Sequence, residues 1–155
     1  MGQSQCRLRQ SIICPSKTNL NALQILENKI LRLLTGGHYD TPIKDMLRDA
    51  DILSVNQLIA FSIMSTVFKI KKSLKPLYLA KRLGFCHQAS AIRTHRNHHD
   101  IGVTFMLQTA REGFIYKASK LWSSLPLNIK METSDKKFRI ELQNWIKFHI
   151  PAIPD

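Results

Sequence analysis

One long stretch of the sequence carries cations and imidazoles without a single carboxylate. No Asp or Glu occurs between Asp51 and Asp100. The Lys and Arg residues of this acid-free stretch are Lys69, Lys71, Lys72, Lys75, Lys81, Arg82, Arg93 and Arg96. Its histidines are His87, His95, His98 and His99. A solvated helix face usually mixes both signs of charge to gain i,i+4 pairs. The pattern therefore indicates a surface that contacts phosphates, and a merely soluble basic surface is the alternative.

The other chemistry that this stretch suggests is metal binding or a cysteine nucleophile. Structural zinc sites use paired ligands, such as two Cys separated by two residues. Here Cys86 adjoins His87 and has no second Cys nearby, so we expect no metal and no cofactor. A nucleophilic Cys86 would need a base that a carboxylate orients, and the stretch has none. We therefore predict no catalytic residue, and we interpret residues 84–100 as a basic loop.

The composition of the whole chain supports a polyanionic partner. Its 155 residues include 23 Lys and Arg against 11 Asp and Glu, a formal net charge of +12. Such a balance favours nucleic acid first and an anionic membrane second. No apolar run approaches the roughly 18 residues of a membrane span. The charges are also too scattered for a membrane-surface helix, so we expect no membrane partner.

Three cysteines, Cys6, Cys14 and Cys86, cannot form a fully paired disulfide framework. The first residues, MGQSQCRLRQ, lack the apolar core of a signal peptide. Unpaired cysteines are typical of a reducing compartment. We therefore expect an intracellular protein, in the nucleus or the cytoplasm.

Apolar residues at helical spacing predict the elements that position these side chains. The four main helices are expected at about residues 19–35, 55–70, 114–125 and 134–148. Short helices are expected at about 42–48 and 76–83. An alternating pattern that is typical of a strand occurs at Ile101, Val103, Phe105 and Leu107, and it is compatible with one short β-hairpin. The predicted fold class is thus mostly α, with an irregular segment at 1–17 and a single helical domain at 18–150.

Local patterns predict the helix ends and the core. Thr18 or Asn19 is expected to cap the first helix, and Ser54 with Gln57 forms a capping box for the second main helix. The expected apolar stripe of the first helix consists of Leu20, Leu23, Leu26, Ile30, Leu33 and Leu34.

Three aromatic residues are candidates for stacking on a nucleobase. Trp122 and Trp145 lie on apolar helical stripes, and we therefore interpret them as core residues. Tyr78 is the better stacking candidate, because it lies within the basic stretch.

Several segments, taken together and in order, resemble a known family. They are residues 23–36 (LQILENKILRLLTG), 54–72 (SVNQLIAFSIMSTVFKIKK), 114–126 (FIYKASKLWSSLP) and 138–146 (FRIELQNWI). This order resembles the segment that follows the polymerase core in reverse transcriptases of non-LTR retrotransposons, of the jockey-like or related lineages. The matching positions are Asn28, Lys29, Arg32, Leu121, Trp122, Leu125, Pro126, Phe138 and Arg139. Ser123 stands where the family usually has Asn.

The resemblance implies a C-terminal, nucleic-acid-binding fragment of an RNA-directed DNA polymerase, from the thumb side of the molecule or beyond it. Its implied partners are RNA or an RNA–DNA duplex, together with the missing polymerase core. Polymerisation needs a carboxylate cluster that holds two metal ions, and this sequence has no adjacent acidic pair. We therefore expect the chain alone to be inactive as a polymerase. The alternative is a non-catalytic module that packs against the polymerase core.

Overall fold

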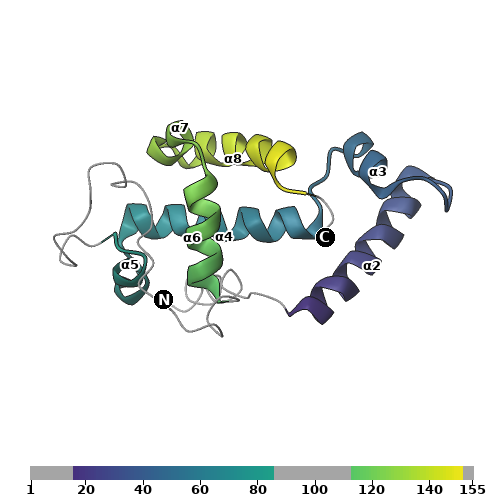
Figure 1. Cartoon of the computed structure of the whole chain (residues 1–155). Helices are drawn as coiled ribbons and strands as arrows, with labels where there is room; N and C mark the ends of the chain where they lie inside the picture. The colour runs from purple at the N-terminus through teal and green to yellow at the C-terminus, as the bar shows by residue number, and fades with distance from the viewer. Residues whose placement is uncertain (1–15, 86–112, 152–155) are drawn as a thin grey trace, which may run out of the picture. The chain divides into compact units, whose positions relative to one another are not determined.

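The computed structural model describes residues 16–85 and 113–151, and these residues are mostly helical (Figure 1). In chain order the helices are α2 (Lys17–Thr35), α3 (Ile43–Asp49), α4 (Val55–Ser73), α5 (Leu77–Arg82), α6 (Phe114–Ser124), α7 (Leu127–Met131) and α8 (Asp135–His149). No strand occurs in these two ranges. The predicted fold class is confirmed, and α2, α4, α6 and α8 correspond to the four predicted main helices. The alternating residues 101–107 and most of the predicted basic loop lie outside the described ranges.

The described chain forms two compact units. The first contains residues 62–85 and 113–142, and the second contains residues 16–61 and 143–151. The first unit therefore includes all six of the predicted phosphate-contacting residues that the structure describes. Both α4 and α8 contribute residues to each unit.

Aromatic rings form the centre of the first unit. The rings of Phe68 and Phe138 are stacked, with their centroids 3.9 Å apart, and Trp122 lies 6.4 Å from Phe138. Trp122 is completely buried, which confirms its interpretation as a core residue. Met64 and Phe68 of α4 are also buried. From residue 63 to 70, α4 buries residues on several sides, as a central helix does.

The second unit contains the predicted capping box. The Gln57 backbone N–H donates to Ser54 Oγ at 3.3 Å, and the Ser54 N–H donates to Gln57 Oε1 at 3.1 Å. Gln57 Nε2 also donates to the carbonyl of Ile150 at 2.9 Å. The box therefore starts α4 and also binds the chain just after α8.

The start of α2 and its packing differ from the prediction. Ser16, rather than Thr18 or Asn19, is the N-cap, because its side chain accepts the backbone N–H of Asn19. The expected core stripe is also wrong: α2 packs against α3 and buries Leu31. The stripe residues Leu23, Leu26, Ile30, Leu33 and Leu34 are exposed. An apolar stripe identifies a face that can be buried, but it does not supply a neighbour.

The proline at position 126 ends one helix and begins another. It follows α6, and it is also the N-cap residue of α7, a short helix that was not expected from the sequence. Proline favours the start of a helix because its fixed φ suits the first turn.

Candidate nucleic-acid interface

Three of the predicted phosphate-contacting lysines lie on the last two turns of α4. Among them, Lys71 Nζ donates to the carbonyl of Lys130 at 2.7 Å and lies 5.7 Å from the centroid of the Trp122 ring. Burial, and to a lesser degree the charge of Lys130, lowers the pKa of Lys71 from its ordinary value. In this arrangement Lys71 joins α4 to α7, and one of its three donors is already used.

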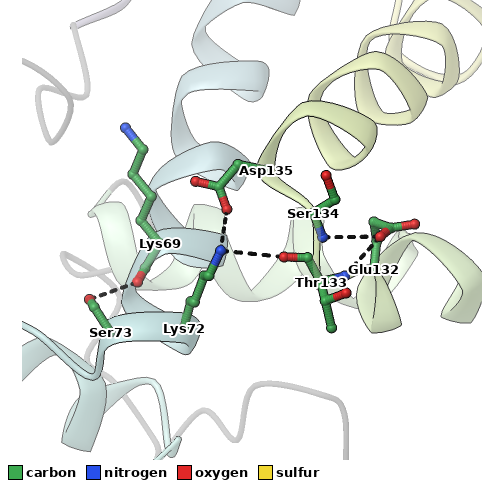
Figure 2. A network of polar contacts seen from close by, with 7 residues as sticks. All are labelled: Lys69, Lys72, Ser73, Glu132, Thr133, Ser134 and Asp135. Atoms are coloured by element: carbon green, nitrogen blue, oxygen red, sulfur yellow. Dashed lines mark hydrogen bonds and ion pairs between the residues drawn. The ribbon is translucent and has the colours of Figure 1, made fainter.

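Lys72 is held by the segment that connects α7 to α8 (Figure 2). Its Nζ lies 2.7 Å from Asp135 Oδ1 and 3.3 Å from the carbonyl of Thr133. The hydrogen bond from Lys72 is the main cause that lowers the pKa of Asp135. Although the sequence near Lys72 has no acid, the fold brings a carboxylate to it from 63 residues away.

The same connection contains a second carboxylate with backbone partners. Glu132 Oε1 accepts the backbone N–H groups of Thr133 and Ser134, at 2.9 and 3.0 Å. These two hydrogen bonds are the largest causes that lower the pKa of Glu132. The carboxylate therefore stabilises the chain where it enters α8.

Lys69 lies beside this network without a hydrogen bond to it. Its ammonium group extends away from Lys72 in Figure 2, and its carbonyl accepts Ser73 Oγ at 2.8 Å. The side chain is exposed. Its charge still acts on Asp135, where it helps to lower the carboxyl pKa. Lys69 can therefore contact a ligand, but the negative charge of Asp135 offsets part of its positive charge.

The remaining described cations of the acid-free stretch lie on α5 and just before it. Lys75, Lys81 and Arg82 are all exposed. No other described residue forms an ion pair or hydrogen bond with these three side chains. Unlike Lys71 and Lys72, they are available to a ligand from the solvent.

A defined C-terminal turn holds α5 in place. The N–H of Phe85 donates to the carbonyl of Ala80 at 2.9 Å, and the N–H of Gly84 donates to the carbonyl of Lys81 at 3.0 Å. Gly84 has φ 72°, the left-handed conformation that this pair of bonds requires. Leu83 beneath the turn is fully buried. The exposed cations of α5 therefore project from a helix with a defined C-terminal end.

The aromatic residues differ in their availability. Tyr78 is 62% exposed on α5, whereas Trp122 is buried. Trp145 is half-buried and stacks on His149, with ring centroids 4.7 Å apart. Among these three, Tyr78 has the accessible ring that base stacking needs.

Several predicted residues lie outside the described ranges. They include Arg93 and Arg96 of the predicted interface, and the possible zinc ligands around Cys86. In residues 16–85 and 113–151, no three His, Cys, Asp or Glu side chains come together as metal ligands could. Within the same ranges, no helix combines the length and apolarity needed to cross a bilayer.

Comparisons with known proteins found no relative of this chain. No family model matches the chain, and neither a curated protein nor a solved structure matches it.

Proposed function

We propose that the chain binds nucleic acid through the surface formed by Lys75, Lys81 and Arg82, named here the α5 surface. The observation that carries the proposal is that these three side chains are exposed and that no described carboxylate pairs with them. The resemblance of the sequence supports a role within a non-LTR retrotransposon reverse transcriptase. There the surface would hold RNA or an RNA–DNA duplex without taking part in polymerisation.

The physical mechanism is the release of counterions from phosphates. Each Lys or Arg that neutralises a phosphate releases condensed cations, so binding weakens as salt rises. Three contacts correspond to a slope of log K against log salt of about −2 to −3. Phosphate contacts position a protein without reading bases, so the affinity should depend weakly on sequence. Lys71 and Lys72 contribute less than their charge suggests, because they hold α4 to α7 and α8.

A salt titration with matched variants tests this proposal. The test variant changes Lys75, Lys81 and Arg82 to Gln, and the probe is a fluorescein-labelled RNA or RNA–DNA duplex. The control changes Lys29, Lys44 and Arg48 to Gln, which removes the same charge from exposed positions of the second unit. We expect the slope to become shallower by about 2 to 3 in the test variant. Equal slopes in both variants would contradict the proposal.

A second candidate function follows from the exposed stripe of α2. The residues Leu23, Leu26, Ile30, Leu33 and Leu34 are exposed along one side of this helix, and Leu33 is 85% exposed. Apolar patches of this kind often mark interaction sites. The resemblance supplies one partner, the polymerase core of a longer chain. On this hypothesis the stripe packs against an apolar surface of that core.

Two neighbouring residues of α2 allow a matched test of the packing hypothesis. Leu26 lies on the stripe, and Ile25 lies on another side of the same helix with a similar exposure. We expect Leu26→Glu to abolish co-purification with a separately expressed polymerase core of the jockey-like family, and Ile25→Glu to preserve it. Equal capture of both variants would exclude the stripe as the contact.

A further inference from the structure

The first turn of α5 presents an exposed aromatic ring. Tyr78 is 62% exposed, and its hydroxyl forms no hydrogen bond with another described residue. Of its two neighbours in the chain, Leu77 is exposed and Leu79 is buried. The buried side chain of Leu79 therefore anchors α5, while the ring of Tyr78 remains in solvent.

Helix geometry brings cations to the same side as this ring. Lys81 and Arg82 follow Tyr78 by three and four residues, the separations at which helical side chains are neighbours. Lys75 precedes the helix by two residues. An aromatic ring bordered by cations is the combination that binds a single strand, because bases stack on the ring and the cations meet the phosphates.

The other exposed aromatic residues lack one part of this combination. Phe148 is 86% exposed, but the adjacent Lys147 pairs with Asp51. Tyr39 is exposed and has the Arg32 guanidinium 5.3 Å from its ring centroid, while that group also donates to the carbonyl of Tyr39 at 2.8 Å. Among the exposed aromatics of the described chain, Tyr78 alone borders cations without a described partner.

We infer that the ligand of the α5 surface is single-stranded nucleic acid, with an unpaired base stacked on Tyr78. This inference rests on the proposed nucleic-acid binding and narrows it. Inside a duplex the faces of the bases are covered by their neighbours, so away from the two ends the ring has no base to stack on and only the cations bind. Unpaired bases offer their faces freely. The α5 surface therefore prefers an unpaired strand over a duplex.

Binding measurements with three variants and three probes test the inference. The variants are Tyr78→Leu, which removes the ring, Tyr78→Phe, which keeps it, and Phe148→Leu as the control in the second unit. The probes are fluorescein-labelled oligothymidylate, a blunt DNA duplex, and an abasic deoxyribose-phosphate oligomer that has phosphates without bases. Because Tyr78 is exposed, both substitutions leave the packed residues of the first unit unchanged, and circular dichroism checks that the helices are retained.

We expect Tyr78→Leu to weaken oligothymidylate binding about tenfold at every salt concentration, with the salt slope unchanged. Tyr78→Phe and Phe148→Leu should stay within about twofold of the wild type, as should Tyr78→Leu on the duplex and on the abasic probe. If Tyr78→Leu binds oligothymidylate as the wild type does, or loses as much affinity for the abasic probe, the inference is wrong although nucleic-acid binding stands. If the wild type binds none of the probes, the proposed function fails as well.

Discussion

At the scale of the residue, an ammonium group serves either the fold or a ligand, and its neighbours decide which. Lys71 and Lys72 are adjacent on α4, yet one donates to a backbone carbonyl and the other pairs with Asp135. Lys81 and Arg82 have no such partner among the described residues. Charge counted along the sequence therefore overestimates the number of cations that a phosphate can reach.

The carboxylates of the α7–α8 connection make stability depend on pH. The pKa values of Glu132 and Asp135 are lowered in the folded chain, by backbone N–H groups and by Lys72 respectively. Between the lowered and the ordinary pKa values, the unfolded chain binds more protons. The stabilisation is therefore complete above the ordinary values, 4.5 and 3.8, and is lost as the pH falls through the lowered ones.

We expect the midpoint of urea unfolding to fall as the pH drops below about 4. Lys72→Met should remove most of the contribution of Asp135, since Lys69 and Arg139 still lower its pKa, and should leave the contribution of Glu132. Urea titrations between pH 7 and pH 2.5, in about 0.1 M salt, measure both. A pH dependence that Lys72→Met leaves unchanged would show that the ion pair does not form in solution.

Glycine at the end of α2 gives a second residue-scale prediction. Gly36 has φ 64°, and a Cβ added there would have no atom within 4 Å. We expect Gly36→Ala to lower the free energy of unfolding by about 1 to 2 kcal/mol through backbone strain alone. Gly36→Asn should cost less, because Asn tolerates this conformation. Chemical denaturation measures both variants, and equal losses would argue against a left-handed residue here.

At the scale of the element, the helices and several of their ends follow from local chemistry. The capping box at Ser54 and the stop at Gly84 were predictable because each depends on residues a few positions apart. The burial of α2 was not predictable, since an apolar stripe shows only that a helix could be covered. The ion pair of Lys72 was equally hidden, because its partner, Asp135, comes from α8. Local sequence patterns therefore predict where the helices lie and which residues could form the site. Contacts between residues far apart in the sequence determine which of the cations remain accessible.

The capping box gives a prediction at this scale. Gln57→Leu leaves two groups without their partner, the buried N–H of Ser54 and the half-buried carbonyl of Ile150. We expect a loss of about 2 to 3 kcal/mol in the free energy of unfolding. Asn56→Ala is the matched control, since its amide donates to the exposed carbonyl of Pro151, and it should cost under about 1 kcal/mol. Urea denaturation measures both, and comparable losses would mean that the box contributes only a surface contact.

At the scale of the whole molecule, the net charge of +12 acts in two directions. A large excess of one sign attracts a polyanion, and it also destabilises the compact state through repulsion between like charges. Ion pairs oppose this repulsion, and those of Lys72 with Asp135 and Lys147 with Asp51 are among the few that the described chain contains. Exposed pairs of this kind contribute little to stability. Repulsion should therefore dominate the response of the free chain to salt.

We accordingly expect salt to stabilise the free protein and to weaken its complex with nucleic acid. Raising NaCl from about 0.05 to 0.5 M shortens the Debye length from over 10 Å to under 5 Å, which screens the repulsion and raises Tm. The same change lowers the affinity for RNA, because the release of counterions into a more concentrated salt solution gains less entropy. Changing Lys75, Lys81 and Arg82 to Gln should raise Tm at low salt and reduce both salt effects, since the same three charges repel one another and bind phosphate. Thermal unfolding and binding titrations over one NaCl series measure the two responses. If Tm falls as salt rises, the attraction within the ion pairs outweighs the repulsion between like charges. The excess positive charge would then not destabilise the folded chain, contrary to the prediction.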